Sequence, residues 1–167
     1  MKNLILIRHA KSSWDDPALS DLERPLNKRG KRDAPVMGRL LKEKGLLPDV
    51  ILASHAKRSL KTATKIAREV GYPKGRIETR EAIYLHGVDA LIELIRALDD
   101  HNNRVFLIGH NPDLTDLTNL LTGSNIANVG TCGVVSIEFP SISWRDISEG
   151  CGRLALFERP PKPTPGA

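Results

Sequence analysis

The chain of 167 residues is poor in cysteine, in aromatic residues and in long apolar runs. It has two cysteines, Cys132 and Cys151, which lack the spacing of metal ligands, and we expect both to be free thiols in a reducing cytoplasm. No apolar stretch is long enough to span a bilayer, and no signal-peptide cleavage site follows the short apolar run near the N-terminus. We therefore expect a cytoplasmic protein without a membrane partner.

Aromatic residues make up only 4% of the chain, too few to supply the stacking platforms that nucleic-acid-binding proteins use. No nucleic-acid recognition motif is present, and no histidines and carboxylates share the spacing of metal ligands. We therefore expect no nucleic-acid partner, no metal and no cofactor. A monomer is expected too, because the sequence shows neither a coiled coil nor a spare apolar face.

The chain carries a net charge of +5. Part of this charge lies in the run Lys28–Arg32, and part lies in a basic stripe within residues 57–68. Such runs usually form solvated helix faces. A second interpretation is that they attract acidic substrates, and a third is that the stripe docks an acidic partner protein.

Apolar runs alternate with helical patterns along the chain. Strands are predicted at residues 4–7, 50–53, 105–108, 133–139 and 153–157, with a brief extended piece around Ile77. Helices are predicted around 36–41, from a cap at Ser54 to Val70, over 88–98, and from Pro112 to 121. This alternation predicts a three-layer α/β fold, in which a mostly parallel sheet carries helices on both faces. We expect one domain over 1–158 and a proline-rich tail, extended or disordered, over 159–167.

Two of the predicted strands end abruptly in a histidine. The run Leu4–Ile7 leads into Arg8 and His9, and the run Val105–Ile108 leads through Gly109 into His110. Ligands of parallel sheets bind beyond the carboxyl ends of the strands, so the two histidines can meet over one pocket.

Arginine beside such histidines indicates a pocket for an anion. The guanidinium offers a rigid fork of donors that matches phosphate oxygens, and Arg58, like Arg8, follows a predicted strand. A neutral histidine can attack phosphorus, and nearby arginines lower its pKa and keep it neutral. A second histidine can donate to a phosphoryl oxygen. The residues therefore favour phosphoryl transfer by positioning and charge stabilisation.

The same residues carry a resemblance to a known family. The segment Arg8-His9-Ala10-Lys11-Ser12 resembles the Arg-His-Gly signature of the histidine phosphatase superfamily, which has the phosphoglycerate mutase-like fold. Further motifs follow in that family's order, and the small size and the Arg-Pro-Leu motif look most like the SixA phosphohistidine phosphatase branch. These motifs are 24–30 (RPLNKRG), 54–59 (SHAKRS) with Thr62 and Ala63, and 109–112 (GHNP).

The resemblance, which extends from Lys2 to about Phe157, implies roles for individual residues. His9 would be the nucleophile that becomes phosphorylated, while Arg8 and Arg58 would hold the phosphoryl oxygens and His110 would complete the pocket. Asn111 would add to anion binding at a helix start, where N–H groups are free. Arg24 would line the pocket or hold its loop.

The sequence departs from the family pattern in two places. Ala10 replaces the usual glycine, and a positive φ would be disfavoured there. Many relatives carry a glutamate as general acid after the third strand, and here the candidate is Glu81, although the motif around it differs. The SixA-like branch lacks this acid. Imidazole leaves phosphorus more readily than an alkoxide, so a phosphohistidine substrate needs less help from an acid.

We therefore expect a phosphatase that works through phosphorylated His9 and removes phosphate from protein phosphohistidine. The alternatives are a small-molecule phosphomonoesterase or mutase of the same superfamily, and a phosphate-binding module without turnover. The partner is accordingly a phosphorylated protein or a small phosphorylated substrate.

Overall fold

The computed structural model describes residues 1–162. Its centre is a single mixed sheet of six strands, with the spatial order β3-β2-β4-β1-β5-β6. Strands β1, β2, β3 and β4 run parallel to one another, while β5 is antiparallel to β1 and β6 is antiparallel to β5. The strands are β1 (Lys2–Arg8), β2 (Val50–Ala53), β3 (Glu78–Thr79), β4 (Arg104–Gly109), β5 (Val134–Phe139) and β6 (Arg153–Glu158).

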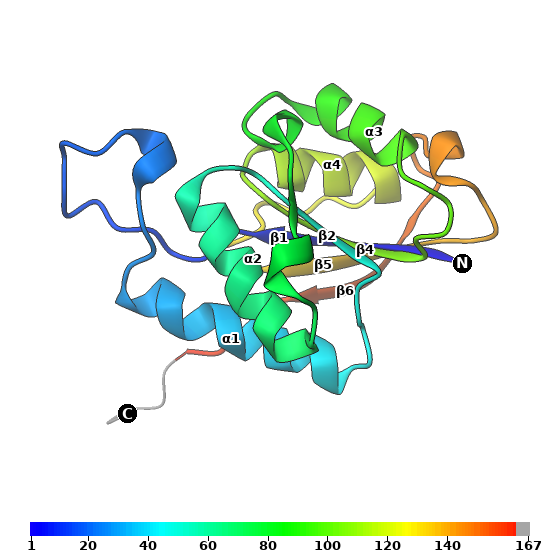
Figure 1. Ribbon diagram of the computed structural model, residues 1–167. Helices are drawn as coiled ribbons and strands as arrows, with labels where there is room; N and C mark the ends of the chain where they lie inside the picture. The colour runs from blue at the N-terminus through cyan, green and yellow to red at the C-terminus, as the bar shows by residue number, and fades with distance from the viewer. Residues whose placement is uncertain (163–167) are drawn as a thin grey trace.

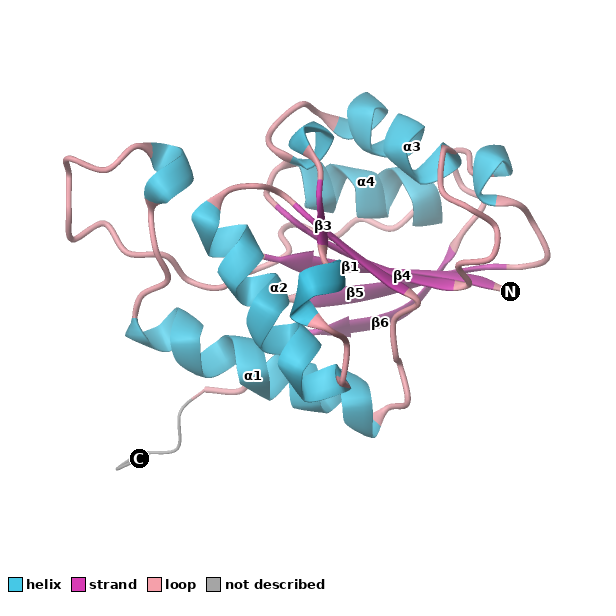
Figure 2. Ribbon diagram, viewed as in Figure 1, coloured by secondary structure: helices cyan, strands magenta, loops and turns pink. Residues whose placement is uncertain are grey.

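Helices cover both faces of this sheet, as Figures 1 and 2 show, and the predicted three-layer α/β fold is confirmed. Helices α1 and α2 lie on one face, and α3 and α4 lie on the other. The helices are α1 (Lys28–Glu43), α2 (Lys57–Val70), α3 (Val88–Arg96) and α4 (Asp113–Thr122), with single-turn helices η1 (Asp21–Glu23), η2 (Lys74–Arg76), η3 (Glu81–Ile83) and η4 (Trp144–Asp146).

The central strand β1 is buried on both faces, and its side chains alternate between two cores. Leu4 and Leu6 pack with residues of α3 and α4, whereas Ile5 and Ile7 pack with residues of α1 and α2. Burial on both sides explains why this strand appears in the sequence as a continuous apolar run.

Helix α1 begins earlier than the apolar pattern predicts. Asn27 is its N-cap, and the Asn27 side chain accepts a hydrogen bond from the Gly30 N–H. Gly30 lies within the first turn of α1. A Cβ at this position would lie 2.2 Å from the Lys11 carbonyl oxygen, so only glycine allows the first turn of α1 to pack against Lys11. The basic run Lys28–Arg32 thus lies within the helix.

The predicted cap at Ser54 is wrong. Helix α2 starts at Lys57 after Ala56, and the Ser54 hydroxyl accepts from the Ala56 N–H at 3.1 Å. A serine that bonds the N–H two residues further on forms a turn instead of a helix cap. This turn leaves the Ser54 hydroxyl free to bond a side chain of the functional site.

The tail beyond β6 is described only as far as Lys162, so the prediction of an extended or disordered segment at 163–167 lies outside the described residues. Residues 159–162 have no regular secondary structure, and the Arg32 guanidinium donates to the Pro161 carbonyl at 3.0 Å. Within the described part of the chain, no helix combines the length and the apolar character needed to cross a membrane.

Candidate functional site

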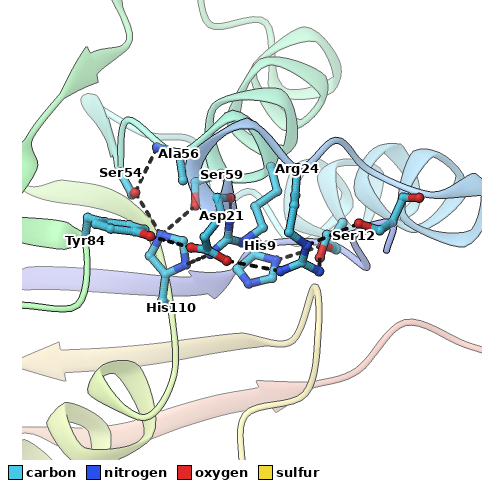
Figure 3. Close-up of polar contacts among 12 residues, drawn as sticks. His9, Ser12, Asp21, Arg24, Ser54, Ala56, Ser59, Tyr84 and His110 are labelled. Atoms are coloured by element: carbon cyan, nitrogen blue, oxygen red, sulfur yellow. Dashed lines mark hydrogen bonds and ion pairs between the residues drawn. The ribbon is translucent and has the colours of Figure 1, made fainter. Parts of the chain in front are cut away.

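The structure brings the two histidines together at the carboxyl edge of the sheet. Strands β1 and β4 pair in parallel with Arg8 opposite Gly109, so His9 and His110 leave the two strands side by side. Their ring centroids are 5.1 Å apart. Figure 3 shows both rings facing the same cluster of polar side chains.

His9 presents one nitrogen to this cluster. Its Nδ1 lies 2.8 Å from the Ala10 carbonyl oxygen, and because a carbonyl only accepts, Nδ1 carries the proton. The lone pair of the neutral ring is therefore on Nε2. Burial above all, together with the charges of Arg58 and Arg8, lowers the pKa of His9 from 6.5 to about 4 against the opposing bond to Ala10. His9 is thus a neutral potential nucleophile at physiological pH.

Ala10 fits where relatives use glycine. It does not adopt a positive φ, and it is fully buried. The Ala10 N–H donates to Thr62 Oγ1 at 2.9 Å, and the Thr62 hydroxyl donates to the Arg58 carbonyl at 2.7 Å. The backbone beside His9 is thereby tied to the first turns of α2.

His110 is oriented by α2 and by the turn before it. Its Nε2 lies 2.8 Å from Ser54 Oγ and 3.2 Å from Ser59 Oγ, while Arg58 Nη2 approaches its Nδ1 at 3.5 Å. An arginine only donates, so Nδ1 accepts and Nε2 carries the proton. Burial lowers the pKa of His110 to about 3, with further contributions from His9 and Arg58.

Two arginines reach the cluster with a donor that has no partner. Within residues 1–162, only three buried side-chain polar atoms lack a hydrogen bond, and two of them are Arg8 Nε and Arg58 Nε. Buried donors are normally satisfied. Each guanidinium is anchored through Nη1: Arg8 Nη1 donates to the Val129 carbonyl at 3.2 Å, and Arg58 Nη1 donates to the Asp21 carbonyl at 2.6 Å. The pair therefore has the chemistry of an anion site.

Asp21 supplies a negative charge at this site. Its carboxylate accepts from Arg58 Nη2 at 2.9 Å, from Arg24 Nη1 at 3.3 Å and from the Tyr84 hydroxyl. Burial acts to raise the pKa of Asp21, but the bonds from Tyr84 and the two arginines outweigh it and lower the pKa to about 2. The loop before α1 thus brings a permanent carboxylate to the basic cluster.

Arg24 is anchored in the same loop. Its guanidinium stacks on the Trp14 ring, with Cζ 3.2 Å from the ring centroid, and it also donates to the Ser13 carbonyl at 3.2 Å and to the Ser12 hydroxyl. Arg24 is therefore both a member of the cluster, through Asp21, and a support for its loop.

Asn111 and Glu81 are not brought into the cluster. The Asn111 amide donates to Val129 and Asn128, and its oxygen accepts from Thr115, so Asn111 holds a loop and the start of α4. Glu81 is exposed on η3 and makes no side-chain hydrogen bond or ion pair with the cluster. Tyr84, three residues further along, reaches the cluster instead, because its hydroxyl donates to the Asp21 carboxylate.

Sequence reasoning missed Asp21, Ser54 and Ser59 as members of the cluster. Asp21 lies in a loop without regular pattern, and only the folding of that loop over α2 reveals it.

Both cysteines are free, as predicted. Burial raises the pKa of the Cys132 thiol, whose backbone N–H donates to the Arg8 and His9 carbonyls. Within residues 1–162, no group of three or more potential metal-ligating side chains is present.

Comparisons with known proteins agree with this geometry. A family model of the histidine phosphatase superfamily (branch 1) matches residues 4–83. An uncharacterized chloroplastic protein of Arabidopsis thaliana is 31% identical over 153 residues, which cover 87% of this chain and 70% of the relative.

Solved structures extend the match to nearly the whole chain. A structure from Agrobacterium tumefaciens, named as a candidate phosphohistidine phosphatase SixA, is 25% identical with a TM-score of 0.81 and covers 95% of this chain and 98% of that one. A protein histidine phosphatase SixA in complex with tungstate has a TM-score of 0.79 at 20% identity, with coverage of 93% and 95%. The chain therefore belongs to the histidine phosphatase superfamily, in its SixA-type branch.

Proposed function

We propose that this phosphatase removes phosphate from phosphohistidine residues of proteins, through a phosphorylated His9. One observation carries the proposal: two buried arginine donors without partners, Arg8 Nε and Arg58 Nε, lie in a cluster with a neutral histidine. A phosphoryl group offers the oxygens that these donors lack, and the His9 Nε2 lone pair offers the nucleophile.

The reaction follows in two transfers. His9 Nε2 attacks phosphorus while the P–N bond of the substrate breaks, and the leaving imidazole keeps the electron pair and takes up a proton. Water then attacks the phosphoryl group on His9, the new P–N bond breaks, and inorganic phosphate leaves with His9 restored. Arg8 and Arg58 stabilise the charge on the phosphoryl oxygens in both steps.

The absence of a placed acid favours phosphohistidine over an alkyl phosphate. Glu81 makes no contact with the cluster, and the Asp21 carboxylate, with a pKa of about 2, holds no proton at neutral pH. An alkoxide leaving group needs a proton donor in the transition state, whereas imidazole is a better leaving group. Efficient hydrolysis of alkyl phosphates is therefore not expected from this cluster.

Rapid-quench labelling tests the proposal. A protein carrying isotopically labelled phosphohistidine is mixed with the enzyme, and the labelled residue of the enzyme is mapped over time. We expect label on His9 that appears and then decays as phosphate is released. His9→Ala removes both signals, whereas His101→Ala, at an exposed histidine, leaves them intact.

Substrate comparison separates the two phosphatase classes. Turnover of phosphoramidate and of phosphohistidine peptides should exceed that of sugar phosphates. Faster turnover of sugar phosphates would contradict the substrate assignment, and binding of phosphate without any label on His9 would contradict catalysis.

A further inference from the structure

A basic groove runs along the exposed side of α2. Lys57, Lys61 and Lys65 recur one helical turn apart, on the side of the helix away from the buried residues that face the site. Together with Lys31 of α1 they line a groove of about 300 Å³, whose remaining lining is Pro25 and Leu26. The groove thus combines four cationic side chains with an apolar floor.

The charge of this groove is not neutralised within the described chain. Among the lysines of residues 1–162, Lys2 alone forms an ion pair, and no acidic residue lines the groove. Four ammonium groups around one groove repel one another, and an acidic ligand would relieve that repulsion. A solvated helix face requires no groove and no apolar floor, and this one has both.

Two residues that line the groove directly adjoin residues of the cluster in the sequence. Lys57 directly precedes Arg58 on α2, and Pro25 directly follows Arg24. A polypeptide whose phosphorylated side chain reaches His9 would therefore run past the groove within a few residues.

Exposed apolar side chains directly follow residues of the cluster in the sequence. Leu22 is 36% exposed beside Asp21, Leu60 is 37% exposed beside Ser59, and Leu85 is 50% exposed beside Tyr84. Trp14, which carries the stacked Arg24, is 75% exposed. The single turn η1, which holds Leu22, packs against α2, which holds Leu60. Apolar residues gathered around a polar site are typical of protein recognition.

We propose that the groove between α1 and α2 docks an acidic segment of the protein substrate, next to the phosphohistidine that enters the site. The proposal rests on the proposed function and adds a substrate preference to it. The apolar rim is aliphatic apart from Trp14, which fits a polypeptide better than the stacked bases of a nucleic acid.

Two synthetic peptides with a central phosphohistidine provide the test. In one peptide Asp and Glu flank the phosphohistidine, and in the other Asn and Gln replace them. We expect the parent to show a kcat/KM about tenfold higher for the acidic peptide at low ionic strength, mainly through KM, and to lose this preference as salt is added.

A matched pair of variants locates the effect. Lys61→Glu with Lys65→Glu should bring the preference for the acidic peptide close to unity, while turnover of phosphoramidate stays at the parental value. Lys44→Glu with Lys74→Glu makes the same change of charge at exposed sites remote from the groove, and the preference should persist. An unchanged preference in the first variant, or none in the parent, would overturn the proposal.

Binding measurements keep this test apart from that of the function. An enzyme inert towards phosphoramidate and both peptides would refute the proposed function. The docking proposal would then be decided by fluorescence anisotropy with the unphosphorylated acidic peptide, whose affinity should fall in the Lys61→Glu, Lys65→Glu variant. Tighter binding of single-stranded DNA than of the acidic peptide would overturn it in favour of a nucleic-acid ligand.

Discussion

Polar side chains are buried at both ends of the parallel strands, at the amino edge and at the carboxyl edge of the sheet. The two edges differ in whether these side chains have hydrogen-bond partners. At the amino edge, Asn3 donates to Ser136 and Ile137 and accepts from Arg104 Nε at 2.7 Å. At the carboxyl edge, Arg8 Nε and Arg58 Nε have no partner. Burial of polar groups alone therefore does not mark a site.

The amino edge shows how a structural polar cluster is completed. Lys2 donates to carbonyl and amide oxygens of the turn after α3, and the Asp49 carboxylate accepts two backbone N–H groups of that turn. A satisfied network rigidifies a fold and leaves nothing for a ligand. Buried donors without partners at the other edge cost stability, and an incoming anion can offset that cost, which is the feature expected of a binding site.

Removing the nucleophile should give the largest difference in effect between the two ends of the sheet. His9→Ala should lower kcat for phosphohistidine on the order of 10⁶-fold, to the background that the rest of the pocket provides. Asn3→Ala, at the other edge, should lower the free energy of unfolding by about 1–3 kcal/mol through its unsatisfied partners, with kcat unchanged. Steady-state kinetics and urea unfolding measure both. Activity that fell equally in the two variants would show that the edges do not differ as described.

Exchanging an arginine for lysine separates charge from geometry. Arg58→Lys keeps the positive charge but loses the fork of donors, and we expect kcat to fall about 100-fold. Arg104→Lys at the amino edge should leave kcat at the parental value, since its guanidinium bonds Asn3 and the Leu47 carbonyl, both remote from the histidines. The finding that would contradict this is full activity in Arg58→Lys.

Acid should lower the free energy of unfolding because His9 and His110 are buried as neutral rings. In the folded protein the pKa of His9 is about 4 and that of His110 is about 3, whereas the ordinary value is 6.5. Between pH 6.5 and 4 the unfolded chain therefore binds protons at these histidines that the folded chain does not bind. The free energy of unfolding should therefore fall as pH drops through this window, by up to about 1.4 kcal/mol per pH unit for each histidine. Urea unfolding across the window measures the slope, which His9→Gln should reduce. A slope unaffected by that variant would contradict the burial of a neutral His9.

The smallest effect is expected at Asp21. Asp21→Asn removes the negative charge that pairs with Arg58 and Arg24. Because an anion then no longer competes with this carboxylate, inorganic tungstate should inhibit about threefold to tenfold more tightly. Glu23→Gln, two residues away in the same turn, should leave the inhibition constant unchanged, because Glu23 forms no ion pair within residues 1–162. Weaker inhibition in Asp21→Asn would mean that Asp21 serves chiefly to orient Arg58.

Particular residues show how far sequence reasoning extends. The buried strands and the histidines that follow them are predictable, because an apolar run can be hidden from water in few ways and a change to polar residues marks its end. Ser54 and Asn111 show the limit. A position near a helix start predicts a cap at Ser54 and an anion contact at Asn111, but in the structure Ser54 bonds His110 and Asn111 bonds Val129 in the neighbouring loop. Short polar side chains bond whatever backbone or side chain lies nearest, which local pattern does not reveal.

The sequence by itself determined the α/β layers, the convergence of His9 and His110, and the basic character of the pocket. These follow from hydrophobic periodicity, from the rule for parallel strand ends and from residue chemistry. Only the tertiary structure decided that Asp21 forms an ion pair with Arg58, that Tyr84 and not Glu81 reaches the cluster, and that four lysines share a groove. Those outcomes depend on how a loop without regular pattern folds over α2 and how α1 and α2 pack together, which are contacts between residues far apart along the chain.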